Sequence, residues 1–515
     1  MTDLHAKPEL TTIPVRNPAD GSVVGSVPVD TPETVAAKAR ELRLYQPEWE
    51  AMGARGRKPW LLKFQDWILD NAEHITDIVQ SESAKPRAEA SIEAPMSADL
   101  LNYFARNAEA FLADRHPRPH SPLMMTKRLT TVWRPYPVVG LIIPWNFPFA
   151  NAALDGISAM AAGAALLLKP SEVTPLSAVE FVRGWSEIGA PPVLALTTGY
   201  AETGAAVIAN SDCVHFTGST ATGRKVAVAC AERLIPYSLE LGGKDPAVVL
   251  ADADLERAAN GIAWGGMTNS GQVCVSIERV YVEAPVYDEF VAKLTDNVSR
   301  LRQGQDDDKY RFDVGAMATS AQRDIVTRHV DDAVAGGARV TIGGKPTGVG
   351  TFFEPTVLAD VDQSMSCMTE ETFGPTLPVV KVADEEEAIR LANDSRYGLS
   401  ASVWTSDPAR GERVARRIEA GAVNVNDAMV NGSQFAVPMP GWKDSGIGAR
   451  HGGADGLLKY CRPQAITTPR IPVRANEPLW YPYSRRKFRI AMGLLRASAA
   501  HGLRRVGLKP RGGAR

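Results

Sequence analysis

The chain has 515 residues, with 57 Lys and Arg against 59 Asp and Glu, which gives a formal net charge of −2 at pH 7. A balance so close to zero argues against a dedicated nucleic-acid-binding protein, because such proteins are usually strongly basic. Hydrophobic residues make up 44% of the chain and charged residues 23%, which is ordinary for a globular protein and excludes disorder throughout. At ~150 residues per domain, the length corresponds to about three domains.

The five cysteines are too few for a disulfide scaffold, and none of their spacings forms the Cys-x-x-Cys pattern of a structural zinc site. Residues 1–30 lack the basic and apolar segments of a signal peptide. No apolar stretch reaches the ~20 residues that a membrane-spanning helix needs. We therefore expect a cytoplasmic enzyme that holds no metal.

Helices are predicted for the N-terminal part of the chain. Apolar residues recur at helical spacing within 33–82 and again over about 96–112. A Pro- and His-rich break at 116–122 follows, and residues 127–132 alternate weakly like a strand.

From Val138 onward, short apolar runs alternate with helical patterns. The expected strands are 138–143, 164–169, 193–198 and 213–218, with helices near 150–162, 175–187, 201–209 and 220–231. After Gly243 a second alternating stretch predicts strands at 246–250, 279–283, 377–382 and 422–426, with helices near 254–263, 286–302, 319–336 and 408–420. Alternation of this kind, with continuously apolar strands, is typical of a doubly wound parallel sheet in an α/β protein.

The C-terminal tail differs in charge from the rest of the chain. From Arg470 onward it has 12 Lys and Arg and one acidic residue, Glu477. Apolar residues recur there at roughly helical spacing, with basic residues on the other side: Phe488, Ala491, Met492, Leu495, Ala499 and Val506 against Arg485, Arg489 and Arg496. A basic amphipathic helix can lie on an anionic membrane surface, or it can cover a neighbouring subunit or the protein's own core, and both interpretations stay open.

Two residues suggest covalent chemistry. Cys274 follows small residues in SGQVCVS, and a thiolate attacks carbonyl carbon readily. Glu240, in ELGGK, has the chemistry of a general base. Taken singly, Cys274 is more simply a buried structural cysteine and Glu240 a salt-bridge partner.

Six short motifs, read together, decide between these interpretations. They occur in a fixed order: PWNFPF (144–149), KPSE (169–172), FTGS (216–219), ELGGK (240–244), GQVC (271–274) and ETFGP (371–375). In order and spacing, residues 15–470 resemble the NAD(P)-dependent aldehyde dehydrogenase superfamily. Segments such as GQVCVSIERVYVE, with the basic tail, resemble an actinobacterial group labelled succinate-semialdehyde dehydrogenase. The tail beyond 470 lies outside the general family pattern.

The resemblance implies a catalytic role for three residues. Cys274 would be the nucleophile that attacks the aldehyde. Asn146 would donate its side-chain amide, with the backbone N–H of Cys274, to the resulting oxyanion. After hydride transfer, Glu240 would deprotonate the water that hydrolyses the thioester, and it would also help to ionise Cys274.

The resemblance also implies a dinucleotide site. Gly218 and Ser219 open a helix, where free N–H groups and the positive end of the dipole suit a pyrophosphate. Lys169 and Glu172 would hold the adenosine ribose, Glu371 the nicotinamide ribose, and Phe373 would pack near the nicotinamide. The other residues expected to contact the cofactor are Ile142, Pro144, Trp145, Ser171 and Leu241.

The cofactor is expected to be NAD, with NADP as the alternative. A carboxylate at Glu172 would accept a hydrogen bond from the ribose 2′-hydroxyl of NAD and repel the 2′-phosphate of NADP.

The chain departs from the family at two positions that concern proton transfer. Many members have Lys where this chain has Asp155, and Glu where it has Arg450. Either the proton relay is rewired, or protons leave through Glu240 and water alone. Arg450 could also be an ordinary surface charge.

A third departure concerns the substrate. Well-known succinate-semialdehyde dehydrogenases grip the substrate carboxylate with two arginines, and the corresponding residues here are Leu154 and Thr268. Phe149, Trp264 and Phe435 would suit a less polar aldehyde, or they could be core residues.

We therefore expect an α/β fold of the aldehyde dehydrogenase type, with a Rossmann-type cofactor domain, an α/β catalytic domain and a β oligomerisation arm. The boundaries are 1–242 for the cofactor-binding domain, interrupted by the arm at about 117–136, then 243–455 for the catalytic domain, 456–470 for the oligomerisation strand and 471–515 for the tail. Because such arms pair between subunits, a homodimer or homotetramer is implied.

Three functions remain open at this point. The first is hydrolytic oxidation of a small-molecule aldehyde, including succinate semialdehyde as one substrate. The second is an acylating reaction that passes the thioester to coenzyme A. The third is a non-catalytic protein of the same fold at the membrane surface, which would place the chain peripherally on a membrane.

Overall fold

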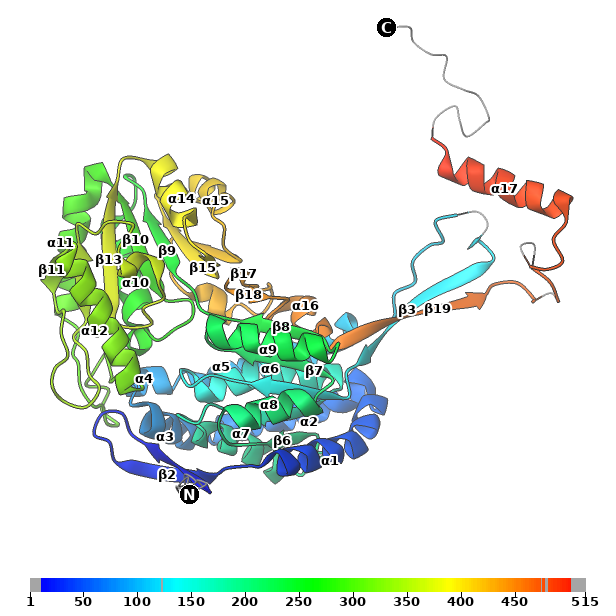
Figure 1. Ribbon diagram of the computed structural model, residues 1–515, viewed down its shortest axis with the longest axis horizontal. Helices are drawn as coiled ribbons and strands as arrows, with labels where there is room; N and C mark the ends of the chain where they lie inside the picture. Colours follow the sequence, from blue (N-terminus) through cyan, green and yellow to red (C-terminus); the bar gives the residue numbers. More distant parts are fainter. Residues whose placement is uncertain (1–10, 122–123, 474, 478–479, 502–515) are drawn as a thin grey trace, which may run out of the picture. The chain divides into compact units, whose positions relative to one another are not determined.

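The computed structural model describes residues 11–121, 124–473, 475–477 and 480–501. These residues divide into two compact units (Figure 1). The first contains the chain up to Phe111 together with Pro135–Tyr460, and the second contains Leu112–Arg134 together with the chain from Cys461.

A six-stranded sheet forms the first half of the larger unit, in the order β18-β8-β7-β4-β5-β6. All its strands are parallel except β18, which pairs antiparallel with β8. Their bounds are β4 Val138–Ile142, β5 Ala165–Lys169, β6 Leu194–Leu196, β7 Cys213–Thr217, β8 Tyr237–Glu240 and β18 Gly446–Ile447. The strands at 138–143, 164–169, 193–198 and 213–218 are thus confirmed, while β18 had no clear sequence signal.

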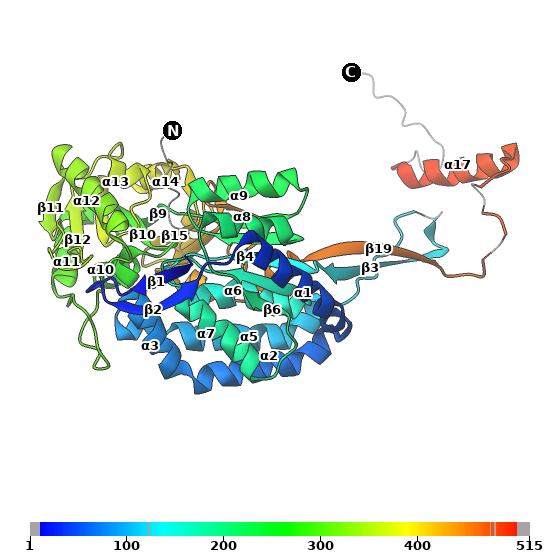
Figure 2. The ribbon, with the colours of Figure 1, turned by 60° about the horizontal axis from the view of Figure 1, so that its bottom comes forward.

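Helices cover both faces of this sheet, which explains why its central strands are fully buried and continuously apolar. Figure 2 shows α8 (Ala201–Asn210) and α9 (Thr220–Glu232) on one side, and α6 (Pro148–Ala162) and α7 (Leu176–Glu187) on the other. This is the doubly wound arrangement that the alternating pattern predicts.

The N-terminal region adds a hairpin and five helices. The hairpin, which was not predicted, pairs β1 (Thr12–Arg16) with β2 (Val23–Pro28). The helices are α1 Pro32–Ala51, α2 Gly53–Asp70, α3 Ala72–Ser83, α4 Arg87–Ala90 and α5 Glu93–Phe111. Phe64 of α2 packs edge-on against Phe181 and Trp185 of α7, so the helical layer is joined to the sheet by an aromatic core.

The second half of the larger unit contains a seven-stranded sheet in the order β11-β12-β13-β10-β9-β15-β16. It is parallel except at its edge, where β11 runs antiparallel to β12. The strands are β9 Asp245–Val249, β10 Ile277–Glu283, β11 Arg339–Ile342, β12 Thr356–Ala359, β13 Thr376–Val382, β15 Ser400–Trp404 and β16 Ala422–Val425. The four strands expected after Gly243 are confirmed, and β11, β12 and β15 were missed.

The helices of this half are α10 Leu255–Met267, α11 Tyr287–Ser299, α12 Ser320–Ala335, α13 Ser366–Thr369, α14 Glu385–Asn393, α15 Pro408–Ala415 and α16 Gly453–Leu458. The four helices expected after Gly243 are confirmed apart from their ends, as α10, α11, α12 and α15, whereas α13, α14 and α16 were missed. A short pair of strands, β14 (Tyr397–Gly398) and β17 (Trp442–Lys443), lies outside the main sheets.

The smaller unit contains a two-stranded sheet of β3 (Lys127–Pro135) and β19 (Cys461–Pro469), followed by helix α17 (Arg485–Ala499). Lys127 forms an ion pair with Glu477 at 2.7 Å. On α17, Phe488 and Leu495 are exposed and Ala491 is buried, while Val506 lies outside the described residues. Among the described residues, no helix is long and apolar enough to cross a membrane. Membrane contact, subunit pairing and the domain boundaries stay predictions.

Candidate active site

A cavity of about 460 Å³ in the larger unit brings five of the six sequence motifs together. It lies at the carboxyl ends of β4, β7 and β8 and beside the turn that precedes β10, which is where ligands bind in open α/β sheets. The lining from these motifs consists of residues 144–147, 217–219, 240–242 and 273–274 together with Glu371 and Phe373.

Cys274 is presented by a turn that only a narrow set of residues can form. Asn269, Ser270 and Gly271 all have left-handed φ angles, of 50°, 55° and 71°. At Gly271 a Cβ atom would lie 2.0 Å from the carbonyl oxygen of Gly374, so only glycine fits. Runs of left-handed residues are costly and are typical of functional sites. The Cys274 side chain is partly exposed and lines the cavity, whereas the other four cysteines are buried elsewhere.

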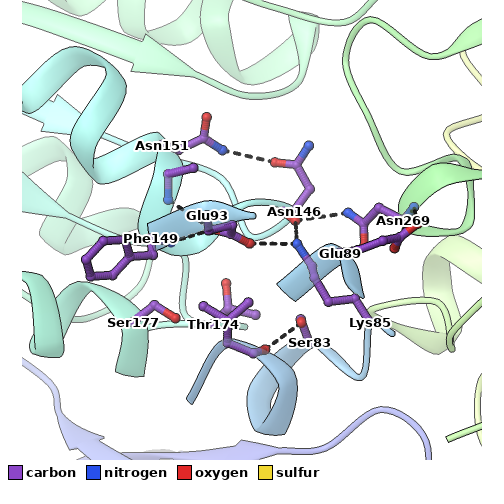
Figure 3. Close-up of polar contacts among 12 residues, drawn as sticks. Ser83, Lys85, Glu89, Glu93, Asn146, Phe149, Asn151, Thr174, Ser177 and Asn269 are labelled. Atoms are coloured by element: carbon purple, nitrogen blue, oxygen red, sulfur yellow. Dashed lines mark hydrogen bonds and ion pairs between the residues drawn. The ribbon is translucent and has the colours of Figure 1, made fainter. Parts of the chain in front are cut away.

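Hydrogen bonds of both its main chain and its side chain hold Asn146 next to this turn. Its amide nitrogen donates to the carbonyl of Gln272 at 3.0 Å, two residues before Cys274. Its side-chain oxygen accepts from Asn151 at 3.2 Å. Its main-chain carbonyl accepts from Lys85 at 2.8 Å and from Asn269 at 2.9 Å (Figure 3). The nucleophile turn and the predicted oxyanion donor are therefore joined directly.

The Lys85 ammonium that holds Asn146 is itself fully buried and pairs with the fully buried Glu93 at 2.8 Å (Figure 3). The other oxygen of Glu93 accepts from the backbone N–H groups of Phe149 and Ala150, at 3.0 and 2.9 Å. A carboxylate at this place satisfies two of the unpaired donors at the start of α6 and complements the helix dipole. One ion pair thus fixes both the Asn146 loop and the helix that follows it.

Arg450 lies at the base of the cavity, between the two predicted catalytic groups. It is 5% exposed. One of its terminal nitrogens lies 3.0 Å from Oε1 of Glu240 and 3.6 Å from Sγ of Cys274. The other donates to Asn151 at 3.2 Å. The possibility that Arg450 is an ordinary surface charge is therefore wrong.

The charges in this cluster perturb one another. Burial raises the pKa of Glu240, and the nearby Arg450 opposes that shift. Burial also raises the pKa of the Cys274 thiol, and the carboxylate of Glu240 raises it further, while Arg450 lowers it. Perturbed pairs of this kind inside a cavity are typical of acid–base sites.

A second buried cluster lies behind Arg450. Asp155 pairs with Lys459 at 2.6 Å and with His215 at 3.0 Å, and its Oδ2 is 4.0 Å from Nε of Arg450. The neighbouring side chains of His215, Lys459 and Arg450 hold the pKa of Asp155 well below its usual value, against the opposing effect of burial. Burial lowers the pKa of His215 to about 4, so the imidazole is neutral at pH 7.

Other residues of the cavity lining have the chemistry that a dinucleotide needs. Gly218 and Ser219 precede α9, and the Ser219 hydroxyl caps this helix by accepting from the N–H of Thr222 at 3.3 Å. The start of a 13-residue helix is a favourable place for phosphate. Leu241, Pro144 and Trp145 supply apolar walls, with the Trp145 ring edge-on to Phe373 at 5.5 Å between centroids.

The segment that bears Glu371 and Phe373 is held by another buried ion pair. Lys244 pairs with Glu278 at 2.6 Å, and Glu278 accepts from the N–H groups of Thr372 and Phe373, each at 2.8 Å. Glu371 accepts from the N–H of Gly243 at 3.0 Å, and burial with the nearby Glu278 raises its pKa to about 8. A carboxyl group lining the cavity suits a ribose hydroxyl, so these residues fit a nicotinamide dinucleotide.

Four predicted cofactor residues lie outside the cavity lining but on the same edge of the sheet. Ile142 and Lys169 end the paired strands β4 and β5, in register with each other. Ser171 and Glu172 follow directly, and Glu172 is exposed. The Lys169 ammonium donates to the carbonyl of Pro170 at 2.9 Å, and burial lowers its pKa. These four residues keep their cofactor roles as predictions.

The residues that the sequence analysis connects with the substrate do not all line the cavity. Trp264, Leu154 and Thr268 line it. Phe149 is instead buried against Phe181, and Phe435 packs against Tyr103 and His451, so the idea that these two line a channel is wrong.

The site therefore combines a thiol and a carboxylate with a surface suited to a dinucleotide, which is the equipment of a dehydrogenase. The Aldehyde dehydrogenase family model matches residues 5–466, and the chain belongs to this family. It is an oxidoreductase that acts on aldehydes, with the α/β fold of its family.

Named relatives and solved structures agree with this assignment. The chain is 38% identical over 490 residues to the "Putative succinate-semialdehyde dehydrogenase [NADP(+)] 2" of Mycobacterium ulcerans, covering 93% of each chain. It is 39% identical to the 4,4'-diapolycopene aldehyde oxidase of a Methylomonas species, covering 92% of this chain and 89% of that one. It matches the Mycobacterium tuberculosis aldehyde dehydrogenase complexed with NAD+ with a TM-score of 0.85 at 32% identity, covering 91% of this chain and 97% of the other.

The Lys85–Glu93 pair gives a stability prediction. Glu93→Ala leaves a buried ammonium unpaired and removes the acceptor of two N–H groups, so we expect the free energy of unfolding to fall by ~3–5 kcal/mol. Denaturant unfolding of the full chain measures this. Asp99→Ala, at an exposed position of the same helix, is the matched control and should change stability little. Equal stability of the two variants would contradict the role given to Glu93.

Proposed function

We propose that this protein oxidises an aldehyde to a carboxylic acid through a thioester on Cys274, which water activated by Glu240 then hydrolyses. The observation that supports this most directly is the position of Cys274, Glu240 and Arg450 at the base of one cavity, with Asn146 joined to the nucleophile turn. Gly218, Ser219, Glu371 and Phe373, which are suited to a dinucleotide, line the same cavity.

The Cys274 thiolate bonds to the carbonyl carbon, and the oxygen becomes an alkoxide that the second N–H of the Asn146 amide can stabilise. The lining that includes Gly218, Ser219, Glu371 and Phe373 would hold NAD(P)+, which would supply the oxidising power as the acceptor of a hydride from that carbon, with a thioester left on Cys274. Glu240 takes a proton from water, the hydroxide adds to the thioester carbon, and the carbon–sulfur bond breaks to give the acid and the thiolate.

Hydrolysis is favoured over transfer to coenzyme A because Glu240 is present beside Cys274. Acylating relatives usually lack this glutamate. A purely non-catalytic role at a membrane surface is disfavoured for a related reason, because a scaffold has no need of a nucleophile in a strained turn.

The nucleophile assignment predicts the behaviour of Cys274→Ala. This variant cannot form the covalent intermediate, so we expect aldehyde-dependent NAD(P)H production to fall by at least ~10³-fold. The change in absorbance at 340 nm measures it, with Cys230→Ala, at a buried position away from the cavity, as the control. Retention of activity by Cys274→Ala would rule out the covalent mechanism.

The substrate end of the cavity favours an apolar aldehyde. Its walls include Met96, Trp264, Met429 and Met439. Within the part of the chain that the structure describes, Arg450 is the only Lys or Arg that lines the cavity, and Glu240 already neutralises it. A carboxylate at the far end of succinate semialdehyde would therefore have no cation to pair with, although mycobacterial relatives carry that substrate in their names.

We propose NAD+ as the preferred cofactor because Glu172 is placed at the sheet edge where the adenosine ribose is expected. A carboxylate there repels a 2′-phosphate. The relatives with NADP(+) in their names make NADP+ the alternative.

Initial rates over a panel of aldehydes test the substrate proposal. We expect kcat/KM for long aliphatic and aromatic aldehydes to exceed that for succinate semialdehyde by at least ~10-fold, since a buried unpaired carboxylate is costly. Each aldehyde is measured with NAD+ and with NADP+. A higher kcat/KM for succinate semialdehyde than for any apolar aldehyde would contradict the proposal.

A further inference from the structure

Arg450 reaches the active site through the topology of the sheet. Strand β18 adds to β8, and Gly446 pairs in register with Glu240, the last residue of β8. The chain then turns through Gly448, whose φ of 82° is left-handed, and this turn brings Arg450 back over the end of β8. The guanidinium that pairs with Glu240 therefore comes from the segment that directly follows β18, the strand paired with β8.

The Arg450 guanidinium contacts both Glu240 and Cys274. Two anions side by side with a single cation would be unfavourable in free energy, so only one of the two groups is expected to be anionic at a time. Nη1 of Arg450 lies 3.0 Å from Glu240 and 3.6 Å from the reacting sulfur of Cys274. When the thiol gives its proton to the carboxylate, the negative charge moves from one neighbour of Arg450 to the other. The cation is then adjacent to the anion before and after the transfer, so the transfer does not leave a buried charge unpaired.

We propose that Arg450 is a catalytic residue that stabilises the Cys274 thiolate and thereby permits proton exchange between Cys274 and Glu240. This inference rests on the proposed function, because it takes Cys274 as the nucleophile. No covalent bond to Arg450 and no further reactant are required. The proton moves from Sγ to a Glu240 oxygen and, after acylation, Glu240 loses it again to solvent before activating water.

The neighbours of Arg450 keep its guanidinium in place. Asn151 accepts from its second terminal nitrogen, and Asp155 lies 4.0 Å from Nε. Lys459 and His215 pair with Asp155 in turn. Asp155 is thus a positioning residue, which orients Arg450 without contacting the reacting atoms.

The remaining titratable neighbour of Arg450 does not supply the charge. His451, the next residue in the chain, is buried, and its pKa is lowered to about 3 by burial and by Arg450 itself. It is therefore neutral across the pH range in which Cys274 would ionise. The cations that face Cys274 and Glu240 in this cluster are Arg450 and, behind Asp155, Lys459.

The test is the pH dependence of Cys274 alkylation in the full-length enzyme without cofactor. Wild type, Arg450→Gln and Arg450→Lys are treated with iodoacetamide from pH 6 to pH 10, and the modified Cys274 peptide is quantified by mass spectrometry. Removing the cation raises the pKa of the thiol, so we expect the alkylation midpoint of Arg450→Gln to lie at a clearly higher pH than that of wild type. Because only the thiolate reacts, alkylation at pH 7.5 should slow by ~10-fold or more. Arg450→Lys, which keeps the charge, should lie between the two.

The rate at the high-pH plateau separates charge from structure. If Arg450 only packs the site, its loss changes access to Cys274 and so the plateau, but leaves the midpoint unchanged. An unchanged midpoint in a folded Arg450→Gln variant, checked by its unfolding temperature, would overturn the proposal.

Glu240→Gln keeps the proposal falsifiable if Arg450→Gln does not fold. In this variant Arg450 has only the thiolate to stabilise and the competing carboxylate is gone, so the midpoint of Cys274 alkylation should fall below that of wild type. A midpoint that stays the same or rises would also overturn the proposal. Failure of the underlying mechanism is recognised separately, because Cys274→Ala would then retain dehydrogenase activity.

Discussion

The central constraint on this site is that a fully buried carboxylate, Glu240, and a partly exposed thiol, Cys274, lie close together, and both become anionic in the proposed reaction. Glu240 is 1% exposed, and burial without compensation would keep it and Cys274 protonated. Arg450, in contact with both groups, lowers the pKa of each and so opposes the effect of burial. Burial in turn matters to the chemistry, because electrostatic interactions are stronger where water is excluded.

The same solution recurs in the loops around the site. Lys85 with Glu93 fixes the loop of Asn146, and Lys244 with Glu278 fixes the segment of Phe373. In each case a buried ion pair also bonds to backbone groups that would otherwise be unsatisfied. Buried pairs of this kind contribute little net stability compared with apolar packing, but removal of one partner is costly. They hold the catalytic loops in defined positions relative to the two sheets.

The parallel strands, and the position of the motifs around one site, were predicted from the sequence better than the edge strands of the sheets. Strands such as Val138–Ile142 are buried on both faces and give an unbroken apolar signal. Strand Gly446–Ile447 is only two residues long and carries no such signal, yet it precedes the turn that positions Arg450. Cys274, Glu240 and Asn146 were singled out by motif, and they lie together around one cavity.

The roles of the supporting charges could not be read from sequence. Lys85 and Glu93 are eight residues apart in a helical region and look like ordinary surface charges until the fold buries them. Arg450 and Asp155 were recognised as departures from the family, but the distances that join Arg450 to Cys274 depend on contacts between segments about 180 residues apart. For Phe149 and Phe435 the sequence left a cavity wall and the core as alternatives, because an aromatic residue near a motif suits both, and the structure places these two in the core.

The central claim, that a thioester on Cys274 is hydrolysed by water activated by Glu240, is tested most directly by trapping that intermediate. Glu240→Gln is mixed with NAD+ and a long aliphatic aldehyde, and the intact mass is recorded within the first turnovers. The account predicts a burst of NADH and an acyl adduct on Cys274 that decays slowly. Steady turnover without an adduct, or an adduct on another residue, would contradict it.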